Sequence, residues 1–146
     1  MPQYFPISLD IARRHCVVVG GGEIALRKVQ ALLDCQAAVT VVSPAFCRGL
    51  TELANNGSIT LVQRKYQTGD LQGATLAITA TDERETNLQV SCEAKERAVL
   101  VNVVDEPASS DFVVPSYFYR GDITIAVSTA GRSSAGKLLP RWSNCA

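Results

Sequence analysis

The chain has 146 residues, of which 47% are hydrophobic and 19% are charged, a composition that supports a folded core. Its 14 basic and 14 acidic residues leave no net charge. No basic run is interleaved with aromatic residues, so nucleic acid is not expected as a partner.

The sequence also argues against a membrane protein and against a protein stabilised by disulfides. No apolar stretch approaches the roughly 20 residues that a membrane-spanning helix needs, and the first ten residues lack the pattern of a signal peptide. The five cysteines lie far apart without a CxxC pair, as isolated thiols do in a reducing compartment. We therefore expect a cytoplasmic protein with no membrane partner and no metal site.

The first predicted elements are a strand and a helix. The stretch HCVVVG at 15–20 is a continuous run of β-branched residues, typical of a strand buried on both faces. Helical spacing follows, with one apolar side made by Ile24, Ala25, Val29, Leu32 and Leu33.

The remaining elements continue this alternation. A helix that opens with a capping box from Asp82 to Glu85 is expected after the middle of the chain. Further strands are expected at 37–43, 58–63, 74–81, 98–105 and 122–129, with another helix at about 45–55. This order predicts an α/β fold with a Rossmann-like, doubly wound, mostly parallel sheet.

A glycine turn joins the first strand to the first helix. Gly20, Gly22 and Ala25 match the G-x-G-x-x-G/A spacing, in which small residues allow a tight turn, close approach of a pyrophosphate and close helix packing. Free N–H groups at the helix start then face the anion. The spacing favours dinucleotide binding over a purely structural turn.

The acidic residue that usually grips the ribose is absent. It is expected about 20 positions after the glycines, but the second strand ends in Ser43 and Pro44. Without a carboxylate to repel a 2′-phosphate, the residues alone do not separate NAD from NADP.

Polar residues follow the predicted carboxyl ends of other strands, where α/β proteins bind ligands. Asp105 closes the apolar run VLVNVV, and it either accepts a proton in the cleft or caps its own loop. Thr81 and Asp82 fit helix caps better than ligands. The stretch at 128–134 is a polar loop that either binds an anion or only connects elements.

Taken together, these segments resemble the amino-terminal domain of the siroheme synthase family, the precorrin-2 dehydrogenases and sirohydrochlorin ferrochelatases. VVGGG…A.RK followed by VNVVD…F..P carries the resemblance, with LAITATDERETN between them and ITIAVSTAGRS after them. The matching segments occur in the family's order over residues 3–134.

The resemblance implies NAD-dependent oxidation of precorrin-2 to sirohydrochlorin, and insertion of Fe2+ in many members. It implies that Asp105 is catalytic, as a general base for either step, and that the macrocycle itself holds the iron. It places the substrate near Asn102 and Ser128. The implied cofactor-binding residues are Gly20, Gly22, Glu23, Ile24, Ser43, Pro44 and Thr81.

After about residue 134 the chain departs from the family, whose helical region supports a homodimer and closes the substrate cleft. We therefore expect an NAD-binding domain at 1–132 and a short divergent tail at 133–146. Two alternatives follow for the function: an NAD(H)-binding regulatory module, or an inactive remnant that binds NAD without oxidising a substrate.

Overall fold

The structure, a computed structural model, describes residues 3–129 and divides into two compact units. The larger unit is Ile7–Asp111, and the smaller combines Met1–Pro6 with Phe112–Ala146. The predicted boundary at 132 and the tail at 133–146 lie outside the described residues and stay predictions.

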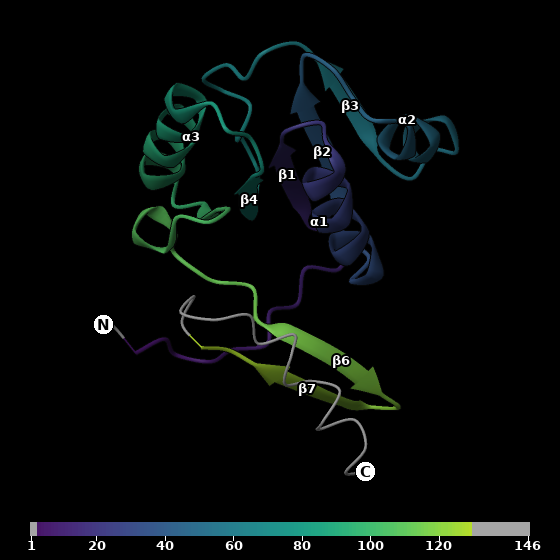
Figure 1. Cartoon of the computed structure of the whole chain (residues 1–146), viewed down its shortest axis with the longest axis vertical. Coiled ribbons are helices and arrows are strands. Elements are labelled where there is room, and N and C mark those ends of the chain that lie inside the picture. The colour runs from purple at the N-terminus through teal and green to yellow at the C-terminus, as the bar shows by residue number, and fades with distance from the viewer. Residues whose placement is uncertain (1–2, 130–146) are drawn as a thin grey trace. The chain divides into compact units, whose positions relative to one another are not determined.

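The larger unit is built on a five-stranded, wholly parallel sheet (Figure 1). The strand order is β3-β2-β1-β4-β5, which reverses direction between β1 and β4. In chain order the strands are β1 (His15–Val19), β2 (Ala38–Ser43), β3 (Thr60–Gln63), β4 (Leu76–Thr79) and β5 (Leu100–Val103). The predicted Rossmann-like fold class is confirmed.

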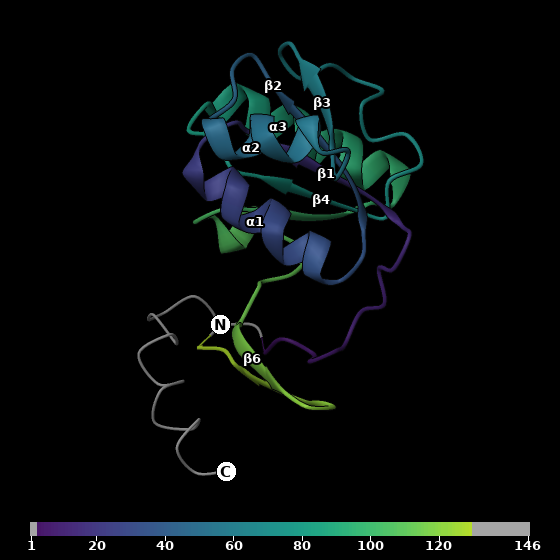
Figure 2. The same ribbon diagram turned by 90° about the vertical axis from the view of Figure 1, so that its right-hand side faces the viewer.

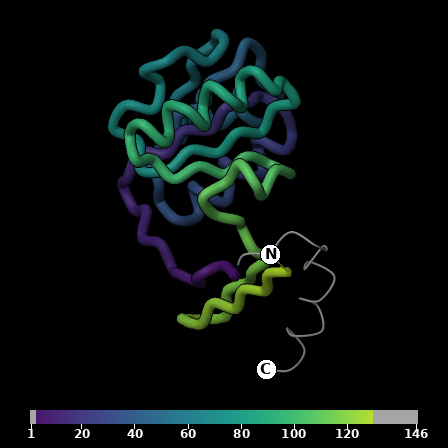
Figure 3. Tube along the Cα trace, turned by 90° about the vertical axis from the view of Figure 1, so that its left-hand side faces the viewer, coloured from purple at the N-terminus to yellow at the C-terminus, as the bar shows by residue number. Residues whose placement is uncertain are grey.

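Helices cover both faces of this sheet. Helices α1 (Glu23–Asp34) and α2 (Arg48–Asn55) lie on one face and stand in front of the strands in Figure 2. Helix α3 (Arg84–Arg97) covers the opposite face, as the view in Figure 3 shows. Each helix therefore buries one apolar side against the strands.

Helix α1 buries a narrower stripe than the sequence predicts. Ala25, Val29 and Leu32 are buried at the i, i+4 and i+7 spacing, whereas Ile24 is 43% exposed. Ile24 occupies the first turn, one residue off this stripe, so the predicted apolar side is wrong to include it. Its exposed position leaves the helix start accessible.

Helix α3 packs against the central strands but begins differently from the prediction. Val90 and Ala94 join a core cluster with Ala77 of β4. The helix starts at Arg84, and its N-cap is Glu83 without a side-chain hydrogen bond to the backbone. The predicted capping box from Asp82 to Glu85 is therefore wrong.

The start of α3 is held instead by side chains on either side of Glu83. The hydroxyl of Thr81 accepts the Glu83 N–H at 3.2 Å, and the Thr86 hydroxyl donates to the Glu83 carboxylate at 2.9 Å. This turn moves the first helical residue beyond the position that the capping box requires.

The smaller unit contains a hairpin that corrects the prediction for 122–129. Strand β7 (Ile123–Val127) pairs antiparallel with β6 (Ser116–Arg120) and does not join the parallel sheet. Only Gly121 and Asp122 separate the two strands, and Gly121 has a φ of +57°. A parallel pair needs a crossover of a dozen or more residues, which a two-residue turn cannot provide.

Candidate functional site

The strand register brings the sequence-predicted residues to one edge of the sheet. Val19 of β1 pairs with Val42 of β2 on one side and with Thr79 of β4 on the other. The residues that follow these strands are therefore level with one another. Because the strand order reverses between β1 and β4, this edge is where open α/β sheets bind their ligands.

The fold itself requires two of the three glycines in the turn. Gly20 has a φ of +134°, and a Cβ there would collide with the backbone carbonyl of Ala80. A Cβ on Gly21 would collide with the carbonyl of Ala45. These two glycines are explained by close packing between neighbouring strand ends.

Gly22 is different, because nothing in the fold requires a glycine there. Its φ is −94°, which any residue adopts, and a Cβ built on it meets no atom within 4 Å. The space beside it is open. A glycine at this position matches a cradle that a bound group approaches closely, as the pyrophosphate does in dinucleotide sites.

The start of α1 completes an anion-binding arrangement. Gly22 is the N-cap and supplies no side-chain hydrogen bond, so the helix is capped by no side chain. The first intrahelical bond runs from the Leu26 N–H to the Gly22 carbonyl at 3.0 Å. The preceding amides, including those of Glu23 and Ile24, have no intrahelical acceptor, which leaves them as donors for an anion.

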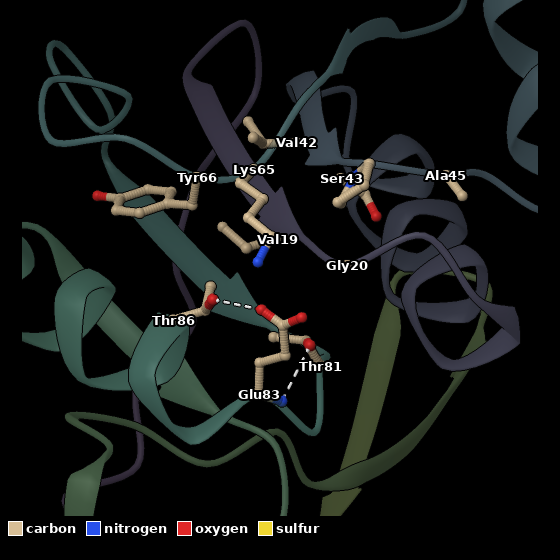
Figure 4. Close-up of a pocket in the computed structure, with 11 residues that line it drawn as sticks. Val19, Gly20, Val42, Ser43, Ala45, Lys65, Tyr66, Thr81, Glu83 and Thr86 are labelled. Carbon is tan, nitrogen blue, oxygen red and sulfur yellow. Dashed lines mark hydrogen bonds between the residues drawn. The ribbon is translucent and has the colours of Figure 1, made fainter.

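A pocket of about 240 Å³ lies beside this turn (Figure 4). It brings together four of the predicted cofactor-binding residues, Gly20, Ser43, Pro44 and Thr81. Its other lining residues are Val19, Val42, Ala45, Lys65, Tyr66, Glu83 and Thr86. The structure therefore adds two charged groups, Lys65 and Glu83, that the motif analysis missed.

Tyr66 is held at the pocket wall by a buried carboxylate. Glu93 of α3 is 3% exposed and accepts hydrogen bonds from the Tyr66 hydroxyl, from the Gly69 amide at 2.7 Å and from Arg97 Nε at 2.8 Å. Burial alone would raise the pKa of Glu93, but these three donors outweigh it and hold the pKa below its ordinary value.

A second carboxylate, that of Asp70, holds the segment at 64–70 through hydrogen bonds within it. Arg64 donates to both oxygens of Asp70 at 2.8 and 2.7 Å, and the Gln67 amide donates to Asp70 at 2.9 Å. Burial alone would raise the pKa of Asp70, but the hydrogen bonds from Arg64 and Gln67 outweigh it and hold the pKa below its ordinary value. The anchored segment at 64–70 thus has fixed contacts on both sides of Lys65.

Asp105 stands just beyond β5 in a conformation that few residues adopt. Its φ is +63°, and its side chain is exposed. Within residues 3–129 its carboxylate forms no hydrogen bond. The loop is capped instead by Ser110, which binds the Val103 amide at 2.8 Å, and by Asp111, which binds the Val101 amide at 3.0 Å.

The loop-capping alternative for Asp105 is therefore carried out by other residues. A non-glycine residue held in the left-handed region is a form of strain that clusters at functional sites. The carboxylate also acts electrostatically on Lys28 of α1. Burial and Arg27 lower the pKa of Lys28, and Asp105 opposes them. Lys28 itself is half-buried.

The two predicted substrate-contacting residues are placed differently. Asn102 is 8% exposed within β5, between residues whose side chains pack toward α3, so it lies on the other face of the sheet. Ser128 follows β7 in the smaller unit. Neither lines the pocket beside the turn, and their contact with a substrate stays a prediction.

Among residues 3–129, no group of three His, Cys, Asp or Glu side chains is placed to hold a metal ion. In the same part of the chain, no helix has the length and apolar character that crossing a membrane requires.

A dinucleotide therefore fits the residues present. The open space at Gly22 and the uncapped start of α1 provide room and N–H donors for a pyrophosphate. The adjoining pocket provides room for an adenosine. Ser43 and Pro44 line this pocket, and their contact with the adenosine ribose stays a prediction.

The comparisons with known proteins agree with this geometry. The model of a family described as "Putative NAD(P)-binding" matches residues 7–116. The siroheme synthase of Pseudoalteromonas atlantica is 43% identical over 129 residues, covering 88% of this chain and 28% of that protein. The siroheme synthase of Methylococcus capsulatus is 40% identical over 144 residues, covering 97% of this chain and 30% of that protein.

A solved structure is also similar. SirC, a precorrin-2 dehydrogenase, is superimposed with a TM-score of 0.86 and 28% identity, covering 98% of this chain and 71% of that chain. The chain spans under a third of the length of the siroheme synthases it matches. The resemblance that the motifs predicted is confirmed, and the chain belongs to the NAD(P)-binding family whose model it matches.

Proposed function

We propose that this chain oxidises precorrin-2 to sirohydrochlorin with NAD as the cofactor, a step of siroheme biosynthesis. The likeness to SirC over 98% of the chain supports this proposal, as do the siroheme synthase relatives. The observation that carries it is Asp105, an exposed carboxylate in a left-handed conformation at the ligand-binding edge, where Ser110 and Asp111 take over loop capping.

The residues divide into binding and chemical roles. The start of α1 with Gly22 holds the pyrophosphate, and Ser43 with Pro44 borders the adenosine ribose. When bound, NAD supplies the acceptor for a hydride. The oxidation also removes a proton from the tetrapyrrole skeleton, and a carboxylate oxygen of Asp105 accepts it as a general base.

The test is anaerobic oxidation of freshly generated precorrin-2, followed by the absorbance of sirohydrochlorin. We expect Asp105→Asn to lose at least a hundredfold in kcat and to bind NAD with a Kd within threefold of the unchanged chain. Glu106→Gln is the matched control, because this neighbouring acid lies in the same exposed loop. Equal losses in both variants would show that only the loop charge matters.

Two outcomes would contradict the proposal at different points. Binding of NAD without any oxidation by the unchanged chain would favour the inactive remnant or the regulatory module. Oxidation at an unchanged rate in Asp105→Asn would support the dehydrogenase activity but contradict the role of Asp105 as its general base.

We also propose insertion of Fe2+ into sirohydrochlorin as a second activity of the same edge. The relatives' name, siroheme synthase, supports it, because siroheme is the iron-containing product. Asp105 would accept the pyrrole N–H protons that leave as iron enters the macrocycle. Purified sirohydrochlorin with Fe2+ and without NAD tests this step alone, and no metal insertion would contradict it.

A further inference from the structure

Lys65 brings a positive charge to the pocket, whereas dinucleotide sites specific for NAD carry a negative charge beside the ribose. In such sites a carboxylate at the end of the second strand grips the ribose hydroxyls and repels a 2′-phosphate. Here β2 ends in Ser43, and the residue paired with Ser43 on β3 is Gln63. Lys65 follows two positions later, so it lies beside the segment after Ser43.

The Lys65 ammonium group is available to a ligand. Within the described range, Lys65 has no ion-pair partner, whereas the adjacent Arg64 is paired with Asp70 through two hydrogen bonds. Figure 4 shows the Lys65 side chain pointing into the pocket from the side of β3. One cation of this adjacent pair is thus neutralised and the other faces the cavity.

Among residues 3–129, the only other charged group lining the pocket is Glu83, which stands at the start of α3. Its carboxylate accepts the Thr86 hydroxyl at 2.9 Å. Glu83 therefore enters the pocket from the start of α3. Lys65 enters from the segment after β3, and its extended side chain carries the ammonium group into the cavity.

The backbone under Lys65 is fixed before any ligand binds. On one side Arg64 is held by Asp70, and on the other Tyr66 is held by Glu93. Only the flexible side chain of Lys65 remains to be ordered. Such preorganisation reduces the entropic cost of a contact between Lys65 and a phosphate group.

We propose that Lys65 is a specificity-determining residue that contacts the 2′-phosphate of NADP, so that this pocket accepts both NADP and NAD. The inference rests on the proposed dinucleotide site and deepens it. It concerns binding and requires no turnover.

The experiment measures the Kd of NAD+ and of NADP+ for the full chain by calorimetry. We expect NADP+ to bind within tenfold of NAD+. In Lys65→Gln we expect NADP+ to bind at least tenfold more weakly and NAD+ to change less than threefold. Lys65→Arg keeps the charge and should retain NADP+ binding. Arg48→Gln, which removes an exposed cation from α2, is the control for net charge.

Two fragments give a second readout. Adenosine 2′,5′-bisphosphate should lose affinity in Lys65→Gln, whereas 5′-AMP, which lacks the 2′-phosphate, should not. The NADP+ affinity of the unchanged chain should also fall more steeply with salt than its NAD+ affinity, because a charge contact is screened.

The outcomes separate this inference from the function on which it rests. Binding of NAD+ with no binding of NADP+ overturns the inference and leaves the proposed function standing. An equal effect of Lys65→Gln on both dinucleotides, or no effect on either, also overturns it. Failure of both dinucleotides to bind the unchanged chain overturns the dinucleotide site itself.

Discussion

At the scale of single residues, the glycine turn separates the needs of the fold from the needs of a ligand. Gly20 and Gly21 are surrounded by backbone atoms, and Gly22 faces open space. Substitutions at Gly20 and Gly22 should therefore have different consequences, although the two residues are only two positions apart.

Gly22→Asp should abolish binding of NAD+ while the fold is retained or stabilised. Aspartate is a preferred N-cap, so it can satisfy an amide of α1 that now lacks a side-chain cap, with a gain of roughly a few tenths of a kcal/mol over glycine. Its carboxylate would occupy the space of the pyrophosphate and repel it. Calorimetry with NAD+ and urea unfolding measure the two effects separately.

Gly20→Ala should instead destabilise the fold. Its Cβ would collide with the Ala80 carbonyl, and alanine disfavours a φ of +134°, so we expect the free energy of unfolding to fall by about 2 kcal/mol or more. Urea unfolding of this variant beside Gly22→Asp makes the comparison. Equal stability of Gly20→Ala and the unchanged chain would contradict this account of the turn.

Some residues of the pocket could be predicted from the sequence and others could not, for a physical reason. Gly20, Ser43 and Thr81 follow strands whose apolar runs are easy to recognise, so their common edge could be expected. Lys65 and Tyr66 reach the pocket only because the segment after β3 is anchored by Asp70 and Glu93. That anchoring depends on contacts between distant parts of the chain, which no local pattern encodes.

At the scale of elements, helix α3 anchors the segment at 64–70 through Glu93. We expect Glu93→Gln to lower the free energy of unfolding by about 2 kcal/mol, because a buried charged acceptor of three hydrogen bonds is lost. Glu52→Gln is a matched control. It also disrupts an i,i+4 pair with arginine, but Glu52 and Arg48 are exposed, so its cost should be about 0.5 kcal/mol or less. Urea unfolding of both variants tests the difference.

The same anchor should make stability depend on pH in acid. The pKa values of Glu93 and Asp70 are lower in the folded chain than in the unfolded chain. Their stabilisation is therefore complete above the unfolded pKa of about 4 and is lost as the pH falls through the folded pKa. Urea midpoints from pH 7 to pH 3 should fall less steeply in Glu93→Gln than in the unchanged chain. Parallel curves would contradict a contribution from Glu93.

Element types were more predictable than their partners. Strong periodicity and β-branched runs identified the parallel strands, and α1 begins directly after the glycine turn. The sequence predicts the strand at 122–129 but not the hairpin partner before it, so the antiparallel pair is missing from the predicted, mostly parallel sheet. The signal was present: Gly121 and Asp122 form a two-residue turn between stretches rich in β-branched and aromatic residues.

At the scale of the whole molecule, bound NAD+ should stabilise the fold. A ligand at 100 times its Kd raises the free energy of unfolding by about 2.7 kcal/mol when it binds only the folded state. We expect the urea midpoint of the unchanged chain to rise accordingly with NAD+. Gly22→Asp should show no such rise, and a rise in that variant would place the cofactor elsewhere.

The reversal of strand order between β1 and β4 has a consequence for how the chain acquires its site. Cys16 pairs with Val39, which follows soon after, but also with Leu76, which arrives only after β2 and β3 have been made. The turn at Gly20 is completed by the strand end at Ala80, so the cradle does not exist in the first half of the chain alone. During synthesis or refolding, we expect this pairing to form late, because non-local contacts close long loops. The dinucleotide can therefore stabilise the chain only after β4 has paired with β1.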